Sequence, residues 1–122
     1  IAKGKTKVIS SNHFSEEPGS ASEIVNEIED MVESGDIIKV CYNTSGRNSG
    51  LKLFEAAWML KESEQKTSIM GIGVGGDWTR IHAPLLNQDL VYSTMESGSH
   101  LSSQGRINAS DLLIAWEMLN YE

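Results

Sequence analysis

Hydrophobic positions along the chain alternate between two kinds of spacing. Short apolar runs at residues 6–12, 36–42, 67–73 and 90–94 are typical of buried strands. Each run is followed by apolar residues at helical spacing. The clearest helical face lies within residues 20–34 and comprises Ile24, Val25, Ile28, Met31 and Val32. The pattern therefore predicts four consecutive strand-then-helix units.

Glycine, proline and capping residues indicate where the helices begin and end. Gly35 is predicted to end the first helix, and a polar loop at 43–50 is predicted to lead into the second. Pro84 predicts that the third helix, near 79–87, is short or kinked. Asn108 is the predicted N-cap of the last helix. The residues expected on its buried face are Leu112, Ala115, Trp116 and Leu119.

Strands that alternate with helices indicate an α/β fold with a parallel sheet covered by helices. Four such units make half of a (β/α)8 TIM barrel, for which about 250 residues is usual. A four-stranded open sheet is the competing architecture. In either fold ligands bind at the C-terminal ends of the strands. We therefore expect one domain over residues 1–122, with its chemistry at that edge.

Composition narrows the classes of partner. The net charge of −7 and the scattered positions of the ten Lys and Arg residues disfavour nucleic-acid binding. No window holds the run of about 20 apolar residues that a membrane span needs. A single cysteine, Cys41, fits a reducing compartment, so a cytoplasmic location is expected. The start at Ile1 suggests a segment of a longer protein.

Lys39 is the most informative residue, because it lies inside the apolar run Ile37-Ile38-Lys39-Val40-Cys41. Strand alternation places Lys39 on the face opposite to Ile38 and Val40. Burial generally lowers the pKa of a lysine, and the free amine is the form that attacks a carbonyl carbon. The alternative is a strand-end lysine whose amine reaches water.

Lys39 and His13 are expected at the C-terminal ends of adjacent strands, and Arg80 is expected at the same edge of the sheet. His13 closes the first strand and can exchange protons near neutral pH, although a lone histidine is more often a loop or capping residue. Arg80 follows the glycine-rich segment 71–76, where a guanidinium can clamp a carboxylate. That segment lacks the spacing of a nucleotide-binding loop. No metal site is expected, because zinc spacing is missing from the remaining candidates, His82, His100 and Cys41.

With these residues placed, the sequence resembles the second half of the type I 3-dehydroquinate dehydratases. Four stretches carry the resemblance in register over nearly the whole chain: Val8-Ile9-Ser10-Ser11-Asn12-His13-Phe14, Asp36-Ile37-Ile38-Lys39-Val40, Ile69-Met70-Gly71-Ile72-Gly73 through Gly76 to Arg80, and Ser102-Ser103-Gln104-Gly105 leading to Ala109-Ser110-Asp111-Leu112. Each motif is short, but their order and spacing together are fairly specific. The implied fold is the C-terminal half of a TIM barrel.

The resemblance also implies roles for single residues. Lys39 would form a Schiff base with the substrate, and His13 would act as general acid and base. Arg80 would bind the substrate carboxylate, and Ser102 would lie in the loop that covers the substrate. The implied reaction is dehydration of 3-dehydroquinate to 3-dehydroshikimate in the shikimate pathway, with no metal or organic cofactor. A homodimer is expected.

The chain departs from the family pattern in two ways. Arg106 stands where the family has the glutamine of a Pro-Gly-Gln loop end, so Arg106 is carried over as a substrate contact in its place. The first half of the barrel, with a carboxylate that orients the histidine, is missing. Two other readings therefore stay open: a class I Schiff-base aldolase, and an inactive half-barrel that serves as an assembly or binding module.

Overall fold

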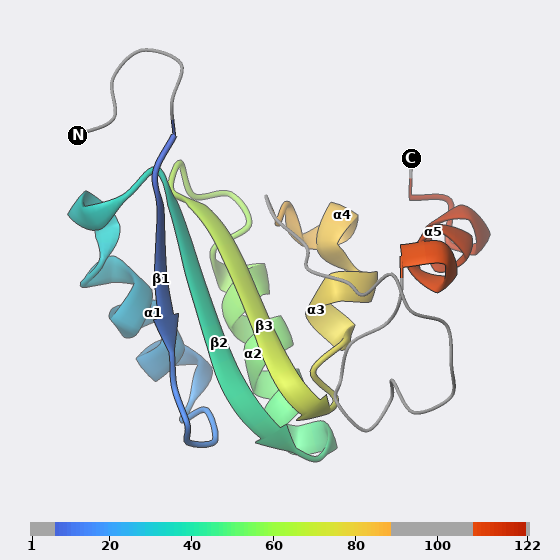
Figure 1. Ribbon diagram of the computed structural model, residues 1–122, viewed down its shortest axis with the longest axis horizontal. Coiled ribbons are helices and arrows are strands. Elements are labelled where there is room, and N and C mark those ends of the chain that lie inside the picture. Colours follow the sequence, from blue (N-terminus) through green and yellow to red (C-terminus); the bar gives the residue numbers. More distant parts are fainter. Residues whose placement is uncertain (1–6, 89–108, 122) are drawn as a thin grey trace.

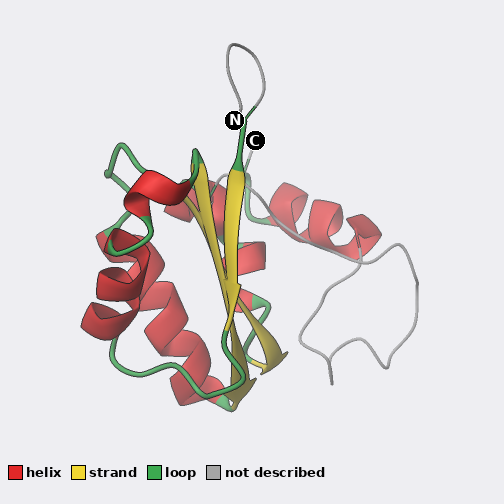
Figure 2. Cartoon of the chain, turned by 60° about the vertical axis from the view of Figure 1, so that its left-hand side comes forward, coloured by secondary structure: helices red, strands yellow, loops and turns green. Residues whose placement is uncertain are grey.

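The computed structural model describes residues 7–88 and 109–121. Strands β1 (Ile9–His13), β2 (Ile37–Ser45) and β3 (Lys66–Val74) form one parallel sheet in that order. Helices α1 (Ala21–Glu29) and α2 (Arg47–Met59) connect them and lie on the same side of the sheet (Figures 1 and 2). Three of the predicted units are thereby confirmed, and the strand predicted at 90–94 lies outside the described residues.

The first helix is shorter than predicted. Its start is fixed by reciprocal hydrogen bonds, in which the Ser20 hydroxyl accepts from the Glu23 N–H and the Glu23 carboxylate accepts from the Ser20 N–H. It ends at Glu29, and a 3₁₀ turn, η1 (Val32–Ser34), follows. Gly35 is extended and does not end α1. A Cβ on Gly35 would lie 3.0 Å from the Ser10 nitrogen, so close packing against β1 explains this glycine.

The hydrophobic core lies between the sheet and the two long helices. Ile38 and Val40 of β2 are fully buried there against Leu53 of α2. The other fully or nearly fully buried members of this core include Ile24, Ile28, Ala56, Ala57 and Ile69. The predicted alternation is confirmed, because the residues of β2 in this core are Ile38, Val40 and Tyr42. Lys39 therefore faces the other side of the sheet.

The prediction of a loop at 43–50 is wrong. β2 continues to Ser45, which pairs with Val74 of β3, and α2 begins two residues later at Arg47. The local sequence is polar and turn-like, but nine consecutive residue pairs with β3 hold it extended. Tertiary pairing thus overrides local preference at the edge where the site is expected.

Beyond β3 the chain forms two single-turn helices, α3 (Trp78–Ile81) and α4 (Ala83–Leu86), which confirms the predicted break around Pro84. Helix α5 (Ala109–Met118) is fastened to them, because the Trp116 indole donates to the Ile81 carbonyl at 2.8 Å. Leu112 is buried as predicted, but Leu119, which follows the last residue of α5, is exposed. Asn108 lies outside the described residues. No helix in the described part of the chain is long and apolar enough to cross a bilayer.

Candidate active site

Lys39 lies in the interior of β2, on the face that α1 and α2 leave uncovered. It is 8% exposed, so most of the residue is withdrawn from water, which argues against the alternative of a strand-end lysine. Its position along the strand differs from the prediction, since six residues of β2 follow it and it is not at the strand end. The prolonged pairing of β2 with β3 is the reason.

His13 is the last residue of β1, as predicted, and lies beside Cys41 in the register of the sheet. Its Nε2 atom is 3.5 Å from the Lys39 amine. This distance is at the outer limit of a hydrogen bond, yet a proton could pass after a small movement. The two residues predicted to react are therefore brought together on one face by the register of β1 and β2.

Two serines flank Lys39 across the sheet, and the sequence reasoning missed both. Ser11 of β1 and Ser68 of β3 are the Cα partners of Lys39, and Ser68 is 1% exposed. Side chains of paired residues in a parallel sheet point to the same face, so Ser11 and Ser68 lie on either side of Lys39 on that face. The sequence analysis named Ser11 only within a stretch that carries the family resemblance, and only the register reveals that both serines flank Lys39.

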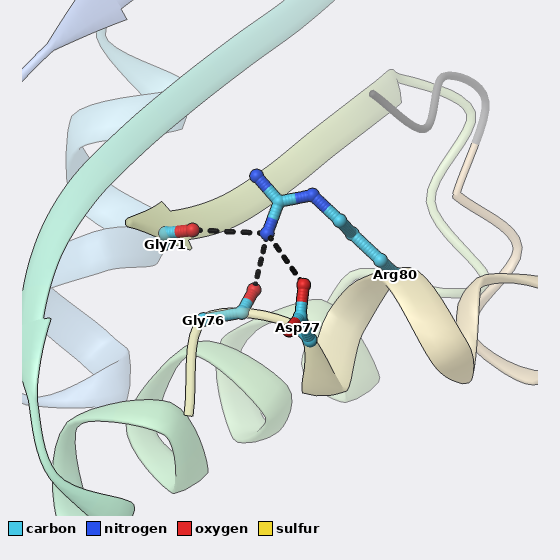
Figure 3. Close-up of polar contacts among 4 residues, drawn as sticks. All are labelled: Gly71, Gly76, Asp77 and Arg80. Atoms are coloured by element: carbon cyan, nitrogen blue, oxygen red, sulfur yellow. Dashed lines mark hydrogen bonds and ion pairs between the residues drawn. The ribbon is translucent and has the colours of Figure 1, made fainter. Parts of the chain in front are cut away.

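Arg80 is held against the C-terminal part of β3. Its Nη1 atom donates to the Gly71 carbonyl at 3.0 Å and to the Gly76 carbonyl at 2.7 Å, and lies 3.5 Å from an Asp77 carboxylate oxygen (Figure 3). The residue is 2% exposed. Figure 3 shows the other terminal nitrogen directed away from these three acceptors. A substrate carboxylate would thus have to meet the guanidinium on that other side.

The turn that receives Arg80 depends on glycine. A Cβ on Gly76 would collide with the Gly71 carbonyl oxygen. The close approach of these two residues sets their carbonyls side by side for one guanidinium nitrogen. This close approach is a structural reason for the glycine-rich segment, which the sequence analysis connected only with carboxylate binding.

The loop after His13 is tied to the start of α2. The Ser49 hydroxyl donates to the Glu17 carboxylate. Hydrogen bonds from Ser45 and then Ser49, with the positive charge of Lys52, hold the pKa of Glu17 below its usual range. Sequence reasoning did not single out Glu17, because it looks like an ordinary surface carboxylate.

The remaining predicted contacts, Ser102 and Arg106, lie outside the described residues. Within residues 7–88 and 109–121, no group of three His, Cys, Asp or Glu side chains is arranged to hold a metal ion.

Known proteins resemble this chain over nearly its whole length. A family model described as type I 3-dehydroquinase matches residues 1–121. The 3-dehydroquinate dehydratase of Methanosarcina acetivorans is 27% identical over 118 residues, which are 97% of this chain and 48% of that protein. The enzyme of the same name from Alkaliphilus oremlandii is 26% identical over 113 residues, 90% of this chain and 43% of that protein. The chain spans about half the length of these relatives.

Solved structures of two dehydratases also superpose on this chain. A type I 3-dehydroquinate dehydratase from Clostridium difficile, solved with covalently modified comenic acid, superposes with a TM-score of 0.79 at 24% identity, covering 94% of this chain and 45% of that one. The 3-dehydroquinate dehydratase of Geobacillus kaustophilus gives 0.76 at 18% identity, with coverages of 92% and 43%. At these identities the likeness shows the fold, which is that of part of a TIM barrel.

Proposed function

The chain belongs to the type I 3-dehydroquinase family, and we propose that it supplies the reacting residues of a lyase that dehydrates 3-dehydroquinate to 3-dehydroshikimate. The observation that carries the proposal is the pair formed by the amine of the buried residue Lys39 and His13 Nε2, 3.5 Å apart on the face of the sheet opposite to α1 and α2. In a closed barrel that face lines the interior, beneath the C-terminal edge where barrel enzymes bind their substrates.

We propose that residues 1–122 form the last four βα units of one barrel domain. Three strands of the described sheet and the half-length match to relatives support this extent. The preceding units would complete the barrel and add the groups that bind the substrate hydroxyls.

In the proposed reaction the Lys39 amine adds to the C3 ketone and water leaves, which forms an iminium. The iminium withdraws electrons and acidifies the neighbouring C2–H bond, from which His13 takes the proton. The resulting enamine expels the C1 hydroxyl, which leaves as water with a proton returned by His13. Addition of water to the iminium then releases 3-dehydroshikimate and the free amine. Covalent catalysis replaces one difficult elimination by easier steps, and the named side chains suffice without metal or organic cofactor.

Arg80, Ser102 and Arg106 are proposed to hold the substrate. The fixed position of Arg80 at the end of β3 supports a carboxylate contact there, because a guanidinium that is already immobilised loses little entropy on binding. Ser102 and Arg106 rest on the family resemblance alone. We further propose a cytoplasmic location, which the lone cysteine supports, and a small-molecule substrate, in line with the net charge of −7 that disfavours nucleic acid. A homodimer is proposed on the family resemblance alone.

Reductive trapping tests the proposal. In the full-length protein that carries this chain, borohydride with 3-dehydroquinate should add the mass of the reduced ligand to the peptide that contains Lys39. Lys39→Ala should abolish the adduct, whereas Lys66→Ala, which removes an exposed lysine of β3, should leave it intact. His13→Ala should slow turnover and still permit trapping.

The alternatives predict other results. Trapping of simple aldol substrates in place of 3-dehydroquinate would favour a class I aldolase. Self-association without any imine would favour the assembly module. An undiminished adduct in Lys39→Ala would refute the assignment of the nucleophile.

A further inference from the structure

Asn43 lies near the C-terminal end of β2, beyond Lys39. It is on the same strand and the same face as Lys39, four residues further toward the C-terminal edge. Its side-chain Nδ2 donates to the Ser15 carbonyl at 2.6 Å, and its backbone N–H donates to the Glu16 carbonyl at 3.3 Å. One residue of β2 therefore holds two consecutive residues of the loop that follows His13.

These bonds replace the regular pairing of β1 with β2. The ladder continues one step past His13, because the Phe14 N–H donates to the Cys41 carbonyl at 2.8 Å. The next step of a parallel ladder would direct the Asn43 N–H to the Phe14 carbonyl. It goes to Glu16 instead, so the chain leaves the sheet directly after Phe14. The direction in which it leaves is set by Asn43.

The same loop is fixed at two further points. The Phe14 ring stacks on Tyr42 with centroids 4.6 Å apart and an angle of 11°. The Glu17 carboxylate accepts from the Ser49 hydroxyl at the start of α2. His13 itself is exposed. The backbone of His13 is thus held by β1 on one side and by this loop on the other. Asn43 lies two residues beyond Cys41, the register partner of His13.

We propose that Asn43 is a positioning residue that keeps His13 Nε2 within reach of the Lys39 amine by fixing Ser15 and Glu16 in the loop after His13. This inference rests on the proposed function, because it assigns Asn43 a role in the proton transfers of His13. Asn43 does not touch the reacting atoms. Its effect on turnover passes through the direction of the His13 side chain.

A double-mutant cycle in the full-length protein separates positioning from general stability. Asn43→Ala should lower kcat by about 10- to 100-fold, the cost of a small misplacement of a catalytic group, with little change in KM. Borohydride trapping at Lys39 should persist. In a His13→Ala background the same substitution should lower kcat by less than about twofold, because no imidazole remains to be positioned.

Two variants act as controls. Asn43→Asp keeps the size of the side chain but cannot donate to the Ser15 carbonyl, so it should reproduce the loss of Asn43→Ala. Asn26→Ala makes the same chemical change on the exposed face of α1 and should leave kcat unchanged.

Equal losses in the presence and absence of His13 would show a general structural role and overturn the inference, as would an unaltered kcat in Asn43→Asp. If the unmodified protein neither traps nor turns over 3-dehydroquinate, the proposed function fails first and takes this inference with it. If the protein turns over 3-dehydroquinate but the effects of Asn43→Ala and His13→Ala on kcat are additive, the proposed function stands and only the role of Asn43 is refuted.

Discussion

Replacing Lys39 by methionine is expected to stabilise the protein while abolishing its chemistry. Lys39 is 8% exposed, and the residues adjacent to it on β2, Ile38 and Val40, are fully buried. A methionine fills nearly the same volume without a charge. If the lysine is there to form an imine, the fold bears the cost of holding an ammonium away from water, and the substitution relieves that cost.

The size of the gain follows from opposing terms. Desolvation of a buried ammonium costs several kcal/mol, and a hydrogen bond to a charged group returns about 1.5–3 kcal/mol. The aliphatic part of the side chain stays buried in both forms, so it contributes little to the difference. We therefore expect Lys39→Met to raise the free energy of unfolding by about 1–2 kcal/mol. In a protein of about 150–250 residues, each kcal/mol corresponds to a rise in Tm of about 2–4 °C.

The assay is thermal and urea unfolding of the full-length protein, followed by circular dichroism, together with borohydride trapping. Ile38→Met is the matched control, since Ile38 is the adjacent residue and is fully buried against the helices. That substitution only exchanges apolar groups and should lower stability by less than about 1.5 kcal/mol. A clear loss of stability in Lys39→Met, larger than the loss in Ile38→Met, would mean that the lysine serves the fold, and the reasoning would be refuted.

Three other predictions follow from buried or tightly packed groups. Burial, with the nearby Glu27 carboxylate, raises the pKa of Tyr42 to about 12, so an absorbance titration should show one phenol that ionises late. The neutral phenol of Tyr42 contributes stability that is lost as the pH rises from about 10 through 12, and this part of the pH dependence should be absent in Tyr42→Phe. Burial lowers the pKa of His82, so stability should fall as pH drops below about 6.5, and less steeply in His82→Asn. Gly76→Ala, which forces a Cβ against a carbonyl, should cost about 1–3 kcal/mol in urea unfolding, whereas Gly46→Ala, with no atom within 4 Å of the added Cβ, should not.

Much of the candidate site was predictable because it depends on residues close in sequence. Lys39 is surrounded by aliphatic residues, and strand alternation alone placed it opposite the helix-facing Ile38 and Val40. The break in the third helical segment followed from the missing N–H of Pro84. In both cases the deciding physics acts within a few residues along the chain.

The remaining features depend on contacts between distant parts of the chain, which the sequence does not reveal. Pairing with β3 extends β2 to Ser45, and this moves Lys39 from the expected strand end into the strand interior. The register between β1 and β2 decides that His13 Nε2 reaches the amine. The close approach of two glycines decides which carbonyls hold Arg80.

Sequence by itself thus determined the order of strands and helices and placed Lys39 on the strand face opposite to Ile38 and Val40, because local spacing fixes the periodicity of each element. Only the tertiary structure decided where along the strand that lysine stands and which groups surround it. Hydrogen bonds between strands select one register among several that satisfy the same hydrophobic pattern, and the distances within the site depend on that register.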